Sequence, residues 1–160
     1  MRVVPRGRWK RILFFCVVGC LVLLVLAQAV PYGRNHSNPP VTKEPAWNSP
    51  ATRDLAMRAC GDCHSNLTAW PWYTNVAPIS WLTQRDVDGG RSNLNFSEWD
   101  KPQDTSIGDI VEAIRGGGMP PWFYTPLHPH AKLSKAEKDE LVAGLEKTLQ
   151  ASPPIGGGGG

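Results

Sequence analysis

The stretch Cys60-Gly61-Asp62-Cys63-His64 determines how the whole chain is interpreted. Its two cysteines lie three positions apart, which puts their thiols about one helical turn from each other on one side of the backbone. A histidine follows directly. This spacing is typical of c-type haem attachment, in which two thiols add to the haem vinyl groups and the adjacent imidazole binds iron. The stretch therefore predicts one covalent haem c held by Cys60 and Cys63, with His64 as the proximal iron ligand.

Two other kinds of site contain a CxxC pair. A zinc site needs further ligands, and the other two cysteines, Cys16 and Cys20, lie in an apolar run where small apolar side chains are the default interpretation. A thioredoxin-type dithiol is expected beside a βαβ pattern, and no strand pattern precedes Cys60. Haem attachment is the preferred hypothesis, and the zinc and dithiol hypotheses stay open.

The N-terminal part predicts a membrane segment. Residues 1–11 contain five basic side chains and no acidic one, and residues 12–30 are almost unbroken apolar sequence of about the ~20 residues that cross a bilayer. Basic residues before the span predict a cytoplasmic N-terminus, a single-pass anchor in a bacterial cytoplasmic membrane and a haem domain in the periplasm. Ala27-Gln28-Ala29 resembles a signal-peptide cleavage site, so removal of the segment is the alternative.

The remaining chain predicts an all-α domain without indications of nucleic-acid binding. The net charge is only +3, and most of the excess lies before the apolar span. Residues 31–48 are rich in proline and predict an extended linker, residues 49–151 a small domain of about four short helices with long loops, and residues 152–160 a disordered glycine-rich tail. The order of helices and loops is similar to that of a class I cytochrome c.

Capping residues and apolar periodicity place the four helices of this domain. Ser49, Ser106 and Ser134 are expected N-caps, the last two with an acidic residue three positions later. Glycines at 89–90 and 116–118 are expected helix ends. We expect helices from Pro50 to about Cys60, from Pro78 to Val87, between Ser106 and Gly116, and from Ser134 to about Leu149.

Met119 is the leading candidate for the distal iron ligand. It opens the constrained loop Met119-Pro120-Pro121 before the last helix, where prolines would hold its thioether near the iron. His128 and His130 are alternatives, and an open or water-bound position is a third. Large rings are a plausible wall for a flat cofactor. The candidates for the haem pocket are Trp70, Trp72, Tyr73, Trp81, Pro120 and Trp122.

Several motifs in order support a resemblance to a known family. They are CGDCHSNLT at 60–68, WPWY at 70–73, APISWL at 77–82, DV at 86–87, GR at 90–91, LNFSEW at 94–99 and LHP at 127–129 with AKLS at 131–134. With them, the segment from about Ser49 to Leu149 resembles the bacterial haem-binding domain family, whose members are small and often membrane-anchored or exported. The resemblance implies haem binding through Cys60, Cys63 and His64.

The function expected from these observations is that of a membrane-tethered, monohaem one-electron carrier, which exchanges electrons with an unidentified redox protein; electron transfer or haem binding is preferred over an enzymatic role, which stays open. The alternative is a haem-based sensor or peroxidase-like enzyme with a displaceable distal ligand. The identity of that ligand separates the two, because a filled axial position suits electron transfer and an open one permits ligand binding.

Overall fold

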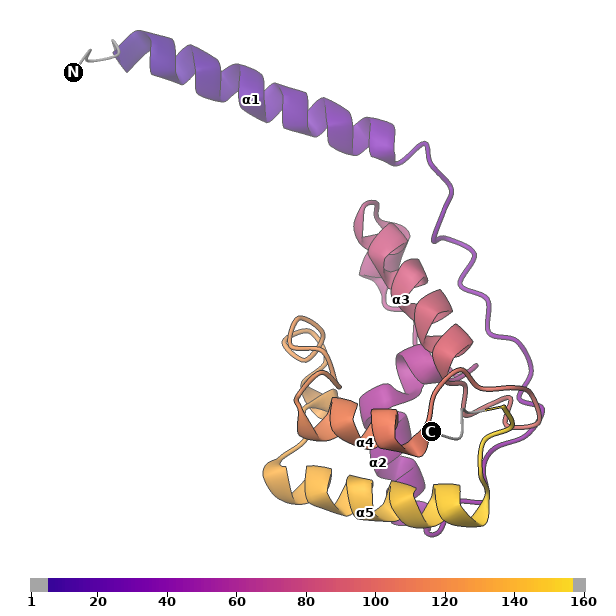
Figure 1. Ribbon diagram of the computed structural model, residues 1–160. Helices are drawn as coiled ribbons and strands as arrows, with labels where there is room; N and C mark the ends of the chain where they lie inside the picture. The colour runs from indigo at the N-terminus through magenta and orange to yellow at the C-terminus, as the bar shows by residue number, and fades with distance from the viewer. Residues whose placement is uncertain (1–5, 157–160) are drawn as a thin grey trace. The chain divides into compact units, whose positions relative to one another are not determined.

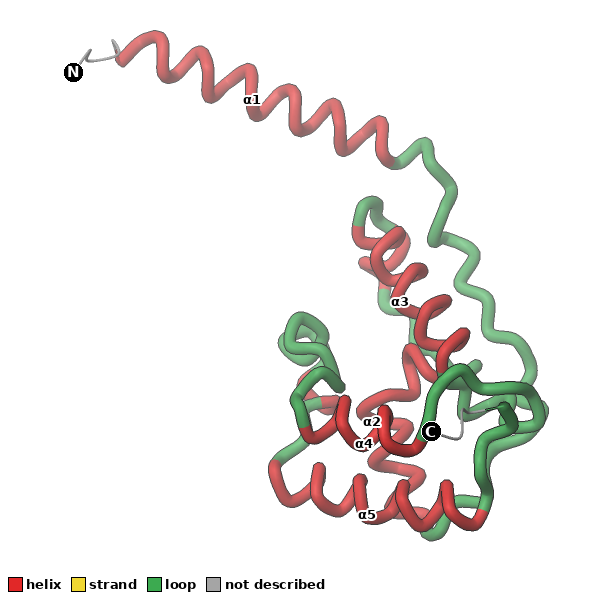
Figure 2. Tube along the Cα trace, viewed as in Figure 1, coloured by secondary structure: helices red, strands yellow, loops and turns green. Residues whose placement is uncertain are grey.

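The computed structural model describes residues 6–156 and is all-helical (Figures 1 and 2). Within these residues there are isolated β-bridges but no strand, which confirms the expected fold class of one apolar N-terminal helix followed by four shorter ones. Residues 1–5 of the basic segment and residues 157–160 of the tail lie outside the described part. The helices are α1 (Arg6–Ala27), α2 (Pro50–His64), α3 (Ile79–Asn93), α4 (Ile107–Arg115) and α5 (Lys135–Ala151), with short 3₁₀ helices at Trp72–Asn75 (η1) and Pro129–Ala131 (η2).

The chain divides into two compact units. Unit 1 contains the chain up to His36 together with Trp70–Arg85, and unit 2 contains Ser37–Ala69 and the chain from Asp86 onward. The boundary falls inside α3. The candidate ligands Cys60, Cys63, His64 and Met119 all belong to unit 2.

Helix α1 of unit 1 has the length and composition of a membrane span. The 20-residue span Arg8–Ala27 contains an 18-residue window with a mean hydropathy of 2.4, and none of that window is buried against protein. At 1.5 Å rise per residue, such a helix is about 30 Å long, which matches the hydrocarbon core of a bilayer. The exposed leucine, valine and phenylalanine side chains of α1 therefore suit a lipid environment.

The helix starts in unit 2 follow the predicted caps. The Ser49 hydroxyl accepts a hydrogen bond from the first turn of α2. Ser106 and Asp109 form a complete capping box at α4, and Ser134 and Glu137 form another at α5. Each box satisfies two backbone N–H groups that would otherwise lack partners. These three predictions are confirmed.

Two helices end later than the sequence pattern indicates. Helix α2 continues through the CxxCH stretch to His64, and α3 passes Gly89 and Gly90 without a break and ends at Asn93. A glycine inside a helix costs about 1 kcal/mol relative to alanine, so the sequence pattern favours an end there. Tertiary packing overrides this preference at Gly90, which lies against the backbone of Cys63.

The core of unit 2 forms where α2, α4 and α5 meet. Figure 1 shows α4 beside α5 and α2 running across α5, in agreement with the contacts between these helices. Leu141, Leu145 and Leu149 of α5 are at most 1% exposed, and burying each such side chain contributes about 1.5–3 kcal/mol. Val142 of α5 and residues from α2, from α4 and from the segments after α3 and η2 complete the cluster: Leu55, Ala56, Ala59, Leu94, Phe96, Trp99, Ile110, Val111, Ile114 and Leu133.

Gly144 allows α2 and α5 to approach closely. A Cβ atom at Gly144 would overlap the hydroxyl of Thr52 and lie 2.7 Å from its Cγ2. Thr52 is buried, so it has little space to move.

We expect Gly144→Ala to lower the free energy of unfolding by about 1–3 kcal/mol, because the added methyl group overfills this crossing. The measurement is chemical denaturation of the full-length protein in detergent, followed by circular dichroism. Gly108→Ala in α4 is the matched control, since its Cβ would meet only the Ser106 hydroxyl at 3.6 Å. Equal stabilities of the two variants would contradict the proposed steric role.

The proline-rich segment packs on unit 2 from residue 37 onward. Thr42 N donates to Ser97 O at 2.9 Å, Trp99 N donates to Lys43 O at 2.9 Å, and Asn66 Nδ2 donates to Pro40 O at 3.1 Å. Residues 37–48, which the sequence analysis expects to be linker, thus form part of a compact unit. Proline and asparagine composition does not show these bonds because their partners lie 26 to 56 positions further along the chain.

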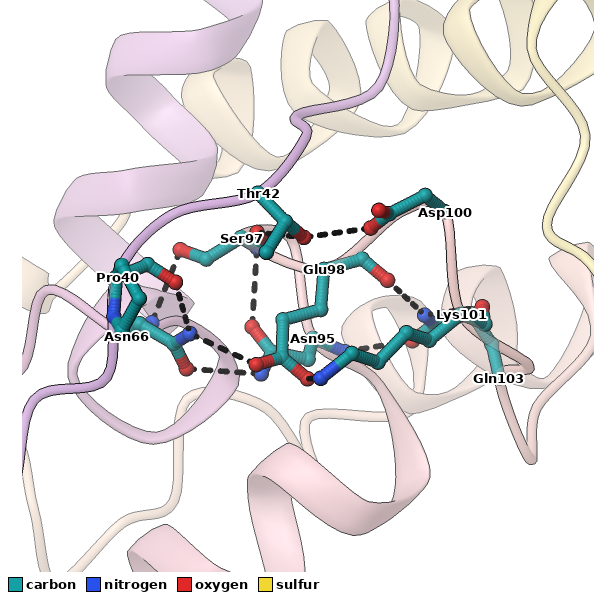
Figure 3. A network of polar contacts seen from close by, with 9 residues as sticks. All are labelled: Pro40, Thr42, Asn66, Asn95, Ser97, Glu98, Asp100, Lys101 and Gln103. Atoms are coloured by element: carbon teal, nitrogen blue, oxygen red, sulfur yellow. Dashed lines mark hydrogen bonds and ion pairs between the residues drawn. The ribbon is translucent and has the colours of Figure 1, made fainter.

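Figure 3 shows the polar network that holds this segment. Asn66, two residues after the CxxCH stretch, donates to Glu98 Oε1 at 3.1 Å and accepts from Asn95 Nδ2 at 2.9 Å. Its own N–H donates to Ser97 Oγ at 2.9 Å. The network joins the chain after His64 to residues 95–103. It also gives both polar atoms of the buried Asn66 side-chain amide hydrogen-bond partners, as buried polar groups require.

Candidate functional site

The last turn of α2 carries three of the predicted site residues to one region of unit 2. Cys60 and His64 line a cavity of about 250 Å³, and Met119 reaches the same cavity from the loop after α4. In the sequence, helices α3 and α4 and long loops separate Met119 from His64, so only the fold brings the two together. Cys63 is half-buried and is not among the residues that line the cavity.

The rest of the wall is mainly apolar. An apolar wall excludes water and lowers the local dielectric constant, so charge inside the cavity is poorly solvated. The apolar lining residues are Leu94, Phe96, Ile110, Ala113, Ile114 and Leu145, and the polar ones are Asn93, Thr105 and Asp109.

The imidazole of His64 is fixed by the backbone that follows α3. Its Nδ1 lies 3.1 Å from the carbonyl oxygen of Leu94. A carbonyl can only accept, so Nδ1 carries the proton and Nε2 keeps its lone pair. The backbone N–H of Phe96 donates to the carbonyl of His64 at 2.8 Å, and this bond also joins the end of α2 to the segment after α3.

Burial lowers the pKa of His64, although its hydrogen bond to Leu94 works in the opposite direction. The neutral imidazole is therefore the favoured form at neutral pH, as a metal ligand must be.

The two thiols are poorly ionised in the absence of a bound group. Burial raises the pKa of Cys60 to about 12, and burial with the nearby charges of Asp86 and Asp62 raises the pKa of Cys63 to about 11. Redox dithiols and zinc ligands act as thiolates, and redox dithiols have lowered pKa values. The described residues contain no group of three or more His, Cys, Asp or Glu side chains placed to hold a metal ion. The raised pKa values disfavour the redox dithiol hypothesis and leave the zinc hypothesis open, because a bound metal itself deprotonates its thiol ligands.

Helix α3 crosses the CxxCH stretch at Gly90. A Cβ atom there would overlap the carbonyl oxygen of Cys63 and lie 2.9 Å from its Cβ. The absence of a side chain at Gly90 thus allows the end of α3, and with it the Leu94 carbonyl, to reach His64. The neighbouring Gly89 has nothing within 4 Å of its Cβ position.

We expect Gly90→Ala to destabilise unit 2 by about 1–3 kcal/mol and to lower the yield of haem-loaded protein, because backbone atoms of Cys63 cannot rotate away. Haem content per polypeptide and the denaturation midpoint of the full-length protein measure the two effects. Gly89→Ala adds the same methyl group in open space and should raise stability by up to about 1 kcal/mol. A larger loss in Gly89→Ala than in Gly90→Ala would contradict this assignment.

The methionine loop is attached to the CxxCH stretch. The N–H of Met119 donates to Ala113 O at 2.9 Å after a turn in which Gly117 has a φ of +78°. Further along, the hydroxyl of Tyr124 donates to the carboxylate of Asp62, the residue before Cys63. The loop is thus held at both ends, with the thioether of Met119 at the cavity.

The two alternative histidines occupy other positions. His128 Nδ1 lies 3.1 Å from Tyr124 O, and its ring stacks on the Tyr124 ring with centroids 3.8 Å apart. Neither His128 nor the exposed His130 lines the cavity. This placement favours Met119 over the two histidines as the candidate distal ligand.

None of the six aromatic and proline candidates lines this cavity. Trp70, Trp72, Tyr73 and Trp81 belong to unit 1, so their assignment to a pocket stays a prediction. Pro120 follows Met119 directly, whereas Trp122 is 82% exposed. The tryptophan content alone could not separate core, surface and pocket positions.

Sequence reasoning gave no site role to Leu94 or Arg91. Leu94 acts through its backbone carbonyl, which no side-chain pattern reveals. The half-buried guanidinium of Arg91 donates to Ser65 O at 2.8 Å, Thr68 Oγ1 at 2.8 Å and Ser37 O at 2.9 Å. Arg91 thus ties the chain after His64 to the start of the proline-rich segment, and its position within the quoted motifs was the only available signal.

Comparison with known proteins matches the chain to a protein family. The sequence profile of a protein family described as "Haem-binding domain" matches residues 22–147. No curated protein and no solved structure matches the chain.

Proposed function

This chain belongs to the haem-binding domain family, and from this premise we propose that it carries one covalent haem c and acts as a membrane-tethered one-electron carrier. The observation that carries the proposal is the convergence of Cys60, His64 and Met119 on one apolar cavity of unit 2.

The residues present fit a haem in three respects. His64 is neutral, with Nδ1 bonded to a backbone carbonyl, an arrangement that orients metal-ligating imidazoles and leaves Nε2 for the metal. The thioether of Met119 supplies a soft sulfur ligand at the same cavity. The aliphatic wall suits a porphyrin face, and Cys60 and Cys63 have the spacing for two thioether bonds.

The haem, when bound, supplies an iron that cycles between ferric and ferrous states. The chain's own residues set the conditions for this cycle. His64 and Met119 would hold the iron through an imidazole nitrogen and a thioether sulfur, a ligand pair that suits electron transfer and stabilises the reduced state. The Leu94 carbonyl holds the His64 ring, and the apolar side chains of α4 and α5 exclude water.

We also propose that α1 anchors the protein in a bacterial cytoplasmic membrane with its N-terminus inside and unit 2 in the periplasm. The length and hydropathy of α1 and the basic residues before it support this orientation. The redox partner would then be an exported or membrane-bound redox protein.

One spectroscopic experiment tests the central proposal. Full-length protein is produced with a cytochrome c maturation system and purified in detergent, and its ferric, ferrous and pyridine haemochrome spectra are recorded. We expect one haem c per chain and the near-infrared ferric band of methionine–iron ligation. A protein without c-type haem absorption would overturn the proposal.

A haem-based sensor or peroxidase-like enzyme is the second candidate function. Met119 follows three exposed glycines, whose backbone has few steric limits, so breaking the bond from Met119 N to Ala113 O would let the sulfur leave the cavity. Cyanide and carbon monoxide titrations separate the two functions. Fast binding at low ligand concentration would favour the sensor or enzyme, and slow binding that requires high concentration would favour the electron carrier.

A further inference from the structure

The C-terminal end of α1 is clamped to a second segment of unit 1. The side chain of Gln28 donates from Nε2 to Ala77 O at 2.9 Å and accepts at Oε1 from Ala77 N at 3.1 Å. Gln28 Nε2 also lies 2.9 Å from Leu24 O in the last turns of α1. One amide side chain thus joins the end of the apolar helix to the residue before Pro78.

Further contacts in unit 1 extend this clamp along both segments. Gly33 has a φ of +78°, and a Cβ atom there would overlap the carbonyl of Ser80. The His36 ring stacks on Trp70 with centroids 4.6 Å apart and an interplanar angle of 12°. Residues 28–36 therefore run along residues 70–80, and the second segment is fixed next to the end of α1.

The clamped segment presents large apolar side chains to solvent. Trp72 is 78% exposed, Leu82 57%, Ile79 43% and Val76 42%. Ile79 and Leu82 lie three positions apart at the start of α3 and so share one face of that helix. A position of Trp72 at a haem pocket stays a prediction, and its ring is the most exposed of these side chains.

The composition of the segment matches a membrane–water interface. Residues 70–84 contain three tryptophans and one tyrosine and no charged side chain. Tryptophan and tyrosine concentrate at the headgroup level of bilayers, where one part of the ring is apolar and the other hydrated. Because α1 is about as long as the bilayer core is thick, Gln28 at its end would lie at that level.

We propose that residues 72–82 rest in the headgroup region of the bilayer that α1 crosses, with Trp72, Ile79 and Leu82 inserted among the lipids. The inference rests on the membrane anchoring in the proposed function. It gives the exposed face a single occupant, the lipid surface, because the clamp ties this segment to the end of α1. It also explains why a second segment is tied to the end of a helix that crosses lipid.

Fluorine NMR of the full-length protein tests this placement. The protein is labelled with 5-fluorotryptophan, reduced, and inserted into nanodiscs of phosphatidylcholine and phosphatidylglycerol; the Trp72 and Trp122 signals are assigned with Trp72→Phe and Trp122→Phe. Two relaxation agents are compared: a gadolinium chelate on the lipid headgroup and a soluble gadolinium chelate. Trp9 of α1, 65% exposed, is the reference for a lipid-facing indole, and Trp122, 82% exposed in unit 2, is the reference for an exposed indole outside unit 1.

We expect the lipid-bound chelate to broaden Trp72 as it broadens Trp9, and the soluble chelate to broaden Trp72 at least about threefold less than Trp122. Gln28→Ala should reduce the lipid effect on Trp72 and leave that on Trp9 unchanged. If the soluble chelate broadens Trp72 as strongly as Trp122, the inference is overturned. Alkaline carbonate extraction distinguishes failure of the proposed anchoring from failure of this inference. Release of the chain from membranes would contradict both, whereas retention of the chain with a water-exposed Trp72 would contradict the inference alone.

Discussion

Protein in which Cys60 and Cys63 are both replaced by serine leaves the maturation system without covalently bound haem, and its haem content falls by at least about tenfold. The physical reason is that serine cannot form the two thioether bonds. In this variant, haem held only noncovalently through His64 and Met119 would be counted only if it stayed bound during purification. Intact-mass spectrometry of the full-length protein measures the result directly, because the wild-type chain should carry the added mass of one haem.

The chain contains its own matched control for this experiment. Cys16 and Cys20 are also free and exposed, but they lie on α1. Replacement of both by serine should leave the covalent haem in place. Covalent haem on the variant that lacks Cys60 and Cys63, or an unmodified wild-type chain, would show that the CxxCH interpretation is wrong.

Met119→Leu removes the near-infrared methionine–iron band of the ferric protein and raises the affinity for cyanide at least about tenfold. It also lowers the reduction potential by on the order of 100 mV, a part of the roughly 0.8 V range over which axial ligands set haem potentials. Leucine fills nearly the same volume, so the packing of the loop is retained while the sulfur is lost. Near-infrared absorbance, cyanide titration and redox titration measure the three effects.

Met57→Leu is the matched control for this substitution. Met57 lies in α2, packs against the core and touches the Gly61 position, and it does not line the cavity. The same chemical change there should leave all three quantities unchanged. His128→Ala should also keep the band. A wild-type protein without the band, together with a weaker ligand field in His128→Ala, would transfer the distal role to His128.

The local parts of the fold could be predicted from the sequence. Helix starts at Ser49, Ser106 and Ser134 depend on a side chain that bonds to an N–H group about three residues away, so the whole interaction lies in a short stretch. The CxxCH spacing is equally local. The ends of helices were less predictable, because Gly89 and Gly90 look alike in sequence and differ only in what lies next to them.

The candidate site mixes both kinds of information. Cys60, Cys63 and His64 follow from one motif, and Met119 follows from its loop, although their roles as ligands stay predictions. The Leu94 carbonyl that orients His64 lies 30 positions away and has no side-chain signature. Tryptophan content indicated pocket walls, but the residue type is the same whether the aromatic ring faces solvent, lipid or protein.

The sequence by itself determined the all-α class, the long apolar helix at the N-terminus, the helix caps and the haem-type spacing of residues 60–64. Each of these depends on residues within one or two helical turns, or on a simple run of apolar side chains. Only the tertiary structure decided that Met119 faces the cavity beside His64, that residues 37–48 pack on unit 2, and that Gln28 holds Ala77. Those features arise from contacts between residues far apart in the chain, where burial and backbone hydrogen bonds, and not residue type, choose the partner.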